Sequence, residues 1–389
     1  MNAPRTLPGR LAHPFSPRGR SNPYPAYRWL RDNDPVHFDV TSRMWLLTAY
    51  ADCALALRDP RFSAALGQRE RVRDDELPPS MLTTDPPEHQ RLRSPGALLM
   101  GPAAIRGISG GITAAIDGLL AGLAGRAEIE ATADIGEPLA TGVLALLFGL
   151  PPADHAAFGE LARRVSANLD PLAGPQAAAA GRAAMGELTR FLDTRTPSAV
   201  APSPFGRLAA DGRLSRAEVL GIAALAVVGG WQPLAEMVGN ALHWLLPRED
   251  AVEQVRGGGQ EAAVLAVDEL LRLESPIPFT ARVTTEDVEL SGGTIPRGAR
   301  VLALVGAANR DPGVFERADE LVVTRSPNPH LAFGAGVHLC LGAPLVRYAG
   351  ALVLGGLLER YPGLRSEGEP PAWAPSLVPR RLVGFTLST

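Results

Sequence analysis

A short segment before a cysteine places the strongest constraint on this chain. Residues 328–342 contain Cys340, one of only two cysteines among 389 residues. Gly334 and Gly336 precede it, and two glycines so close together suit a tight loop whose backbone approaches something large and flat. The apolar run Leu341–Leu358 predicts a helix, and a thiolate at a helix start is favoured by the helix dipole and by free amide N–H groups. The segment therefore indicates a sulfur ligand held ionised for a metal.

The composition is that of a soluble globular protein with room for a large core. The chain is 46% hydrophobic and 20% charged, with a net charge of −3, so no basic excess suggests nucleic acid. Two cysteines in unlike surroundings do not form a disulfide framework, which favours a reducing, cytoplasmic compartment. The first eight residues have no apolar core flanked by charge, so neither a signal peptide nor a membrane anchor is expected.

Hydrophobic periodicity predicts a mainly helical chain with a small β-rich region. Residues 1–35 are expected to run over the surface before a helix starts at Tyr27–Arg31, and 64–79 and 169–179 to cover a pocket. Predicted helices cover 51–58, 105–125, 135–150, 154–168, 176–193, 216–246 and 262–273, and predicted strands fall in 36–40, 44–48, 282–290 and a hairpin at 376–387.

The segment Val219–Leu246 is apolar nearly all round, which predicts a buried helix. Gly229, Gly230 and Pro233 interrupt the run, so a membrane span is not expected. One stripe of this helix is polar at helical spacing: Gln232, Glu236, Asn240 and His243.

The cysteine segment resembles the haem-binding loop of the cytochromes P450, Phe-x-x-Gly-x-x-x-Cys-x-Gly. Phe333, Gly336, Cys340 and Gly342 fill those places. The resemblance implies that Cys340 is the proximal haem-iron ligand and that the loop, including Gly334, holds haem b. Two alternatives stay open on the residues alone: a buried structural cysteine, and a zinc site shared with His338.

Four more motifs stand in the order that this family has. They are His89 with Arg93 on one helical face, the long apolar helix, Glu269-x-x-Arg272, and Ala308-Asn-Arg-Asp-Pro312. On residues alone, a His/Arg face is more often a solvated surface. The resemblance implies propionate contacts instead, from His89, Arg93, Arg282 and His330, because guanidinium and carboxylate pair well. It also implies that Glu269 and Arg272 form a buried structural ion pair.

The resemblance covers about residues 36–387 and implies one P450 domain over 1–389. The fold would be a mainly α triangular prism, with haem between the central helix and the cysteine-loop helix. Its β-rich parts would lie at about 36–48, 282–305 and 376–387, and its helical core at about 85–275 and 340–360. The expected substrate pocket is lined by Trp231, Ile277, Pro278, Leu377 and Val378.

The central helix departs from the family pattern, Ala/Gly-Gly-x-Asp/Glu-Thr-Thr. Here the matching residues are Gly229, Gly230, Trp231, Gln232 and Pro233. In the family, the acid and the threonine relay protons during dioxygen activation. Gln232 cannot deliver a proton by titrating, and Pro233 has neither hydroxyl nor N–H and frees the Gly229 carbonyl, where an ordered water can bind. The structural alternative is that Pro233 only kinks a long helix. Proline here also resembles peroxide-using members, although those pair it with arginine.

Together these features predict a haem-thiolate oxidoreductase of specialised metabolism, such as antibiotic biosynthesis. Dioxygen and electrons from a ferredoxin-type donor with an NAD(P)H reductase would oxidise a small aromatic or peptide-derived molecule. The altered catalytic group, Gly229, Gly230, Gln232 and Pro233, favours radical ring coupling or desaturation beside plain hydroxylation. Alternatives are a peroxide-driven enzyme and a haem protein that binds a ligand or carrier domain without oxidising it. The protein is expected to be a monomer.

Overall fold

The computed structural model describes residues 7–65, 80–166, 170, 174–195 and 203–389. Most of the two expected pocket covers, 64–79 and 169–179, lies outside the described residues. What is described of them is Ala64, Ala65, Asp170, residue 174 and the start of a helix at Pro175.

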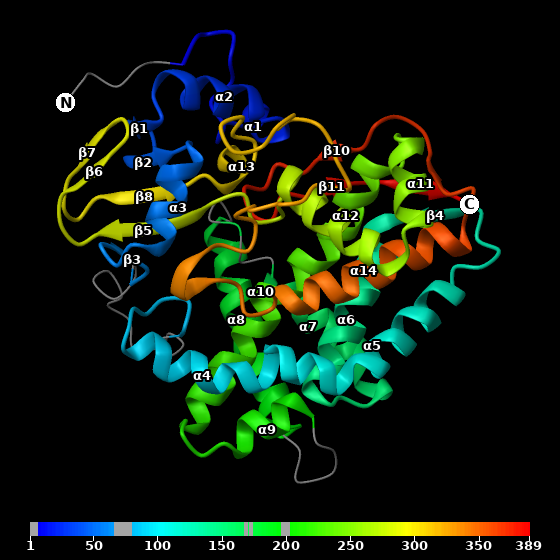
Figure 1. Ribbon diagram of the computed structural model, residues 1–389. Helices are drawn as coiled ribbons and strands as arrows, with labels where there is room; N and C mark the ends of the chain where they lie inside the picture. Colours follow the sequence, from blue (N-terminus) through cyan, green and yellow to red (C-terminus); the bar gives the residue numbers. More distant parts are fainter. Residues whose placement is uncertain (1–6, 66–79, 167–169, 171–173, 196–202) are drawn as a thin grey trace.

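Helices make up the larger part of the protein and lie mainly on the right of Figure 1, with most of the strands on the left. The predicted helices are confirmed, with ends shifted by a few residues. Their bounds are α1 Pro17–Ser21, α2 Tyr24–Asn33, α3 Tyr50–Arg58, α4 Glu88–Met100, α5 Pro102–Ala121, η1 Ala131–Gly136, α6 Glu137–Phe148, η2 Pro152–Asp154, α7 His155–Ser166, α8 Pro175–Thr194, α9 Pro204–Ala210, α10 Arg216–Leu245, α11 Glu249–Gly257, α12 Gly259–Leu273, α13 Val305–Ala308, η4 Gly336–His338 and α14 Ala343–Arg360.

The strands form one five-stranded sheet and smaller ones. The large sheet has the order β1-β2-β8-β5-β3, and only the β2–β8 pair is parallel. The strands are β1 Val36–Asp39, β2 Met44–Leu47, β3 Phe62–Ser63, β4 Glu128–Glu130, β5 Thr280–Thr284, β6 Val288–Leu290, β7 Gly293–Ile295, β8 Arg300–Ala303, β9 Arg365–Ser366, β10 Ala372–Trp373, β11 Leu382–Val383 and β12 Thr386–Ser388. The predicted hairpin at 36–48 is confirmed as β1–β2.

Two terminal segments differ from the prediction. Residues 376–387 are not one hairpin, because β11 pairs with β10 and β12 pairs with β4 and β9. The expected hairpin tip near Leu377–Pro379 is kept, since it lies between β10 and β11. In the N-terminal segment the helix expected from Tyr27 is present, but it begins earlier, at Tyr24, and a short helix α1 precedes it. Helix α2 buries Ala26, Tyr27 and Leu30, because these apolar side chains share one face of the helix.

Helix α10 is the central element. A capping box begins it, in which the Ser215 side chain accepts from the Glu218 amide and the Glu218 carboxylate accepts from the Ser215 amide. The helix then contacts α4, α6, α7, α8, α12 and α14. By length and composition, three helical segments could cross a membrane: 88–121, 131–148 and 216–245. In this structure α10 uses much of that apolar surface to pack against other helices.

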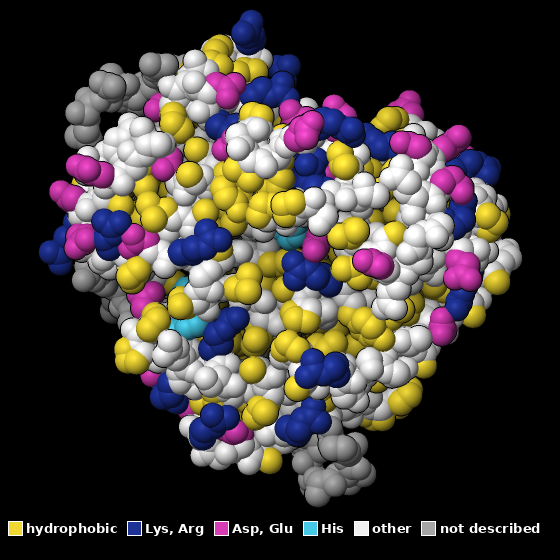
Figure 2. Space-filling model, in the orientation of Figure 1, with side chains coloured by type: hydrophobic (Ala, Val, Ile, Leu, Met, Phe, Trp, Pro, Cys, Tyr) yellow, Lys and Arg dark blue, Asp and Glu magenta, His cyan; other side chains and the backbone are white. Residues whose placement is uncertain are grey.

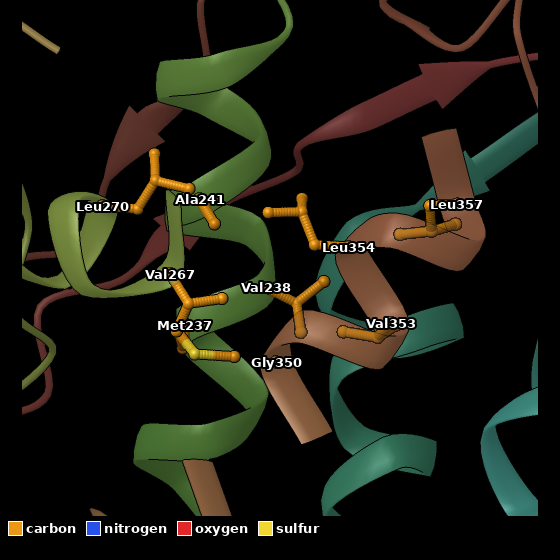
Figure 3. Close-up of a pocket in the computed structure, with 9 residues that line it drawn as sticks. All are labelled: Met237, Val238, Ala241, Val267, Leu270, Gly350, Val353, Leu354 and Leu357. Carbon is orange, nitrogen blue, oxygen red and sulfur yellow. The ribbon is translucent and has the colours of Figure 1, made fainter. Parts of the chain in front are cut away.

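A small apolar cavity lies where α10, α12 and α14 meet (Figure 3). The side chains of these three helices point toward one another around it, among them Met237, Val267 and Leu354. No polar side chain and no residue of the cysteine loop lines it. It is a gap in the helix packing and offers no group that could do chemistry.

Candidate functional site

The loop before Cys340 has the tight backbone that its glycines predict. Gly334 and Gly336 have φ angles of +71° and +68°, a region that L side chains rarely adopt. A Cβ at Gly336 would lie 2.6 Å from the Leu57 carbonyl oxygen, so this position also needs glycine for space. The Cys340 amide donates to the Phe333 carbonyl over 2.8 Å, which closes the loop and fixes where the cysteine stands.

Two opposing influences act on the Cys340 thiol. Desolvation by the protein packed around it raises its pKa, whereas backbone hydrogen bonds from Gly342 and Ala343 and the charge of Arg93 lower it. Desolvation is the larger effect, so the pKa is raised overall. The side chain still keeps accessible surface. The predicted stabilisation by amides at a helix start is therefore present, and burial outweighs it in the free thiol.

Four nitrogen-rich side chains form a cationic cluster next to this loop. His89 and Arg93 come from α4, Arg282 from β5 and His338 from η4. The His89 and His338 rings lie 4.3 Å apart between centroids. Desolvation first, then Arg282 and His89, lowers the pKa of His338 to about 4. Desolvation and Arg93 likewise lower the pKa of His89.

The cationic cluster has unsatisfied nitrogen atoms. Both ring nitrogens of His89 and Nε2 of His338 are buried without a hydrogen-bond partner in the described chain. Arg282 is buried too, and its hydrogen bonds go to the Thr280 hydroxyl at 3.1 Å and the Ala281 carbonyl at 2.7 Å, not to a carboxylate. Buried polar groups need partners, and buried guanidinium needs negative charge. The two carboxylates of a haem fit this cluster.

His330 is the one predicted propionate contact that does not join the cationic cluster. Its Nε2 is 3.2 Å from Asp268, and its Nδ1 accepts from the Ala332 amide at 3.2 Å. None of these contacts is to the cationic cluster, and His338 takes the fourth place instead. The signal in the sequence was the position of His338 within the loop, two residues before the cysteine. On the sequence alone, His338 is a candidate only for a zinc site. Among the described residues, no group of three or more His, Cys, Asp or Glu could hold a metal ion.

Glu269 and Arg272 form a buried ion pair on α12, as the resemblance implied. Both side chains are fully buried, with N–O distances of 2.7 and 2.8 Å in a bidentate arrangement. Arg325 and the Val322 amide also bind Glu269, each at 2.9 Å. Arg272 further donates to three backbone carbonyls, those of Asn309, Ala318 and Glu320. The pair therefore joins α12 to the chain segment that leads into the cysteine loop.

The unusual residues of α10 lie within an unbroken helix. The helix continues through Pro233; Gly229 is exposed, whereas Gly230, Gln232 and Pro233 are half-buried. Trp231 points elsewhere, because it is buried and its indole N–H donates to the Thr141 hydroxyl of α6 at 2.9 Å. The expectation that Trp231 lines the substrate pocket is thus not supported, and it packs in the helical core.

The other expected pocket residues are brought together only in part. Pro278 and Leu377 line one small cavity, which they share with Arg20, Tyr27 and Arg380. Ile277 is half-buried and Val378 is buried, and neither lines that cavity. The segment before β11 and the segment after α12 are therefore neighbours, and both lie next to the N-terminal residues Arg20 and Tyr27.

The site thus combines a cysteine at a helix start with an unsatisfied cationic cluster, and comparison with known proteins shows the family to which the chain belongs. A family profile for "Cytochrome P450" matches residues 264–373. The "Biotin biosynthesis cytochrome P450" of Bacillus subtilis is 30% identical over 88% of this chain and 90% of its own length. "Nocardicin C N-oxygenase" of Nocardia uniformis is 35% identical over 91% and 92%. The chain belongs to the cytochrome P450 family and is of the soluble bacterial type.

Solved structures share this fold. The crystal structure of CalO2 superposes with a TM-score of 0.87 at 30% identity, covering 97% of this chain and 98% of that one. P450BioI, in complex with an acyl carrier protein ligated to hexadec-9Z-enoic acid, superposes with a TM-score of 0.85 at 29% identity, covering 94% and 98%. The P450 fold is confirmed. Membership of the family also confirms haem b as the cofactor and oxygen-dependent oxidation as the class of reaction.

Proposed function

We propose that Cys340 is the iron ligand and that His89, Arg93, Arg282 and His338 hold the haem propionates. The unsatisfied buried nitrogens of the cationic cluster and the fixed cysteine loop support this assignment. When bound, haem with a thiolate ligand supplies dioxygen activation for the oxidation of unreactive bonds. The protein orients the substrate, excludes water and handles protons.

We propose that the reaction is an oxidation in specialised metabolism other than plain hydroxylation, such as ring coupling or desaturation. One observation carries this: the two positions of the family's acid and threonine hold Gln232 and Pro233, in an otherwise continuous α10. Neither side chain donates a proton by titrating, so the substrate itself would furnish one. An aromatic or peptide-derived molecule with acidic O–H or N–H groups suits that need. The relatives named for biosynthetic oxidations support the metabolic setting.

The proposed electron donor is a ferredoxin with an NAD(P)H reductase. All 38 basic residues of the chain are arginine, and Figure 2 shows basic side chains across the lower half of the face in view. The cysteine-loop segment, orange in Figure 1, lies near the middle of this face. Small iron–sulfur carriers are acidic as a rule, and such a face would steer them. We further propose that the chain works as one domain, as a cytoplasmic monomer.

A peroxide-driven reaction is the second candidate, and Pro233 is the observation that favours it. Hydrogen peroxide already carries the two electrons that a redox partner would deliver and the two protons that a relay would deliver, so a helix without acid or hydroxyl is better suited to it than to dioxygen. Two turnover assays separate the candidates: one with peroxide alone, one with ferredoxin, reductase, NAD(P)H and dioxygen. The first candidate predicts product only in the second assay.

The substrate class is tested by a spectral screen of the ferric enzyme with aromatic compounds, cyclic peptides and carrier-bound acids. We expect an aromatic or cyclic-peptide ligand to change the iron spin state and to be consumed under dioxygen. A coupled or desaturated product supports the proposal, and a hydroxylated one as sole product contradicts it. A spin-state change without consumption would favour a protein that binds without oxidising.

A further inference from the structure

Two neighbouring segments of the chain meet at one buried arginine. The first segment is 276–279, after α12, and the second is 376–379, before β11. Arg380 follows the second segment directly and is 7% exposed. Its backbone amide donates to the Pro276 carbonyl of the first segment over 2.8 Å. Its carbonyl accepts from the Asn240 side chain of α10 over 2.9 Å. The backbone of this one residue therefore connects both segments to the central helix.

The guanidinium of Arg380 is held from three further directions. Its Nε donates to the carboxylate of Glu274, at the end of α12. Nη1 donates to the Arg20 carbonyl over 2.6 Å and Nη2 to the Ser21 carbonyl over 3.1 Å, both in α1. The group also lies over the Trp373 ring of β10, 3.9 Å from its centroid. Each nitrogen has a partner, so the side chain has a single well-defined position.

The carboxylate that binds Arg380 is equally well partnered. Glu274 is 2% exposed and accepts from the Tyr24 hydroxyl and from the Trp244 indole N–H, the latter over 3.2 Å. A second cation, Arg310, lies 4.0 Å from this carboxylate and 3.4 Å from the centroid of the Tyr24 ring. A buried ion pair is favourable only with such additional partners. We call these five residues the Glu274 junction.

The two segments lie close to the proposed haem site. The first segment runs directly into β5, the strand that carries Arg282 of the cationic cluster. Arg282 follows Pro278 by four residues, which is about 14 Å of fully extended chain at most. Pro278 of the first segment and Leu377 of the second line one cavity together with Arg380. The guanidinium therefore borders the space that separates the two segments.

We infer that Arg380 is a positioning residue, which sets the separation of the two segments and thereby the size of ligand accepted beside the haem. Its amide holds the first segment, and its guanidinium fixes its own place against α1 and α12. The second segment, which ends at Arg380, must follow. This inference rests on the proposed haem site, because that site places the two segments beside the bound ligand.

The test compares two iron-binding probes, imidazole and 4-phenylimidazole, in spectral titrations of the haem-loaded ferric enzyme. Imidazole needs little more than the iron, whereas the phenyl ring must also fit the walls around it. Arg380→Gln should weaken 4-phenylimidazole binding by about tenfold, the effect of one or two lost contacts, and leave imidazole binding nearly unchanged. Arg380→Lys keeps the charge beside Glu274 and should recover part of the loss.

A milder variant keeps the test decisive if Arg380→Gln does not fold. Tyr24→Phe removes one hydroxyl of the Glu274 junction and keeps its charges, so it should shift the ratio of the two dissociation constants in the same direction, by about threefold. Tyr361→Phe is the matched control. It removes a tyrosine hydroxyl that donates to the Leu120 carbonyl in the helical part of the protein, and the ratio should stay as in the wild type.

An unchanged ratio in both Arg380→Gln and Tyr24→Phe would overturn the inference. An equal loss of affinity for both probes, together with loss of haem, would also overturn it, because it would show general destabilisation. Failure of the proposed haem site gives a different result, since the wild-type protein would then lack the thiolate signature of its reduced carbonyl adduct. Failure of the proposed reaction changes only the product and leaves the ratio of the two probes as predicted.

Discussion

The residues that support the cysteine loop and the central helix α10 differ in how fully their buried polar groups are partnered. On the cysteine side, Glu269 and Arg272 are fully buried with each charge partnered several times, and the loop backbone is fixed by a hydrogen bond from Cys340. On α10, Gln232 Oε1 is buried without a partner in the described chain, Pro233 withholds an N–H, and Glu236 is a buried acid.

The contrast separates what fixes the cysteine loop from what selects the reaction. The cysteine loop is held by satisfied charges and a hydrogen-bonded backbone, which leave few alternatives. Unsatisfied or strained groups concentrate where function needs them. The predictions below test this division, from the largest expected effect to the smallest.

Glu269→Ala should lower the free energy of unfolding by about 3–5 kcal/mol, because it leaves the buried guanidinium of Arg272 uncompensated. Urea unfolding followed by circular dichroism measures this. The matched control is Glu253→Ala, which removes another i, i+3 partner of an arginine, Arg256. That glutamate is 67% exposed, so its loss should cost less than about 1 kcal/mol. Equal effects of the two substitutions would contradict a structural role for the buried pair.

Glu236→Gln should stabilise the protein in alkaline solution and have little effect in acid. The folded-state pKa of about 7 lies above the ordinary 4.5, so the folded protein retains a proton that the unfolded chain has lost. The wild-type free energy of unfolding therefore falls as pH rises from 4.5 to 7, by up to about 3 kcal/mol. Glutamine does not titrate.

The measurement is a set of urea unfolding curves at about pH 5 and about pH 8 for wild type and Glu236→Gln. The difference between the two proteins should grow from near zero to its full size across that interval. Glu137→Gln is the control, since this half-buried carboxyl should give a smaller change. A pH-independent difference for Glu236→Gln would show that the carboxyl is ionised throughout.

Arg282→Leu and His338→Leu should each weaken haem binding by about 2 kcal/mol, or roughly thirtyfold, the size of one hydrogen bond to a charged group. Transfer of haem to an excess of an apo-globin acceptor measures the dissociation rate. His330→Leu is the control. Because His330 binds Asp268, its loss should leave haem dissociation nearly unchanged. Faster haem loss in His330→Leu than in His338→Leu would favour His330 over His338 as a propionate contact.

The double substitution Gln232→Glu with Pro233→Thr should raise the yield of hydroxylated product per NAD(P)H by about tenfold, less than a well-placed general acid contributes elsewhere. It restores the acid and hydroxyl that the family carries. Product and NAD(P)H consumption are measured together under dioxygen, and Val228→Ala on the same helix serves as control. An unchanged yield would mean that the departure on α10 has little bearing on the reaction.

Much of the fold and of the cysteine site followed from local pattern. The apolar run of α10 and the paired glycines before Cys340 are local patterns that predict a buried helix and a tight loop without reference to distant residues. The misses needed contacts between distant segments. His330 and His338 are both near the cysteine in sequence, and only the position of α4 shows that His338 meets His89. The buried position of Trp231 depends on Thr141, which lies 90 residues away. The raised pKa of Glu236 depends likewise on η1 and on Arg381, far from it in the chain.

The central claim is a bond between the Cys340 sulfur and haem iron, and the absorption spectrum of the dithionite-reduced carbonyl adduct tests it most directly. The haem-loaded protein should show the red-shifted Soret band that a thiolate ligand produces, and Cys340→His should lose that shift while still binding haem. An unshifted band in the freshly purified wild-type protein, or a shifted band that survives in Cys340→His, would contradict the account.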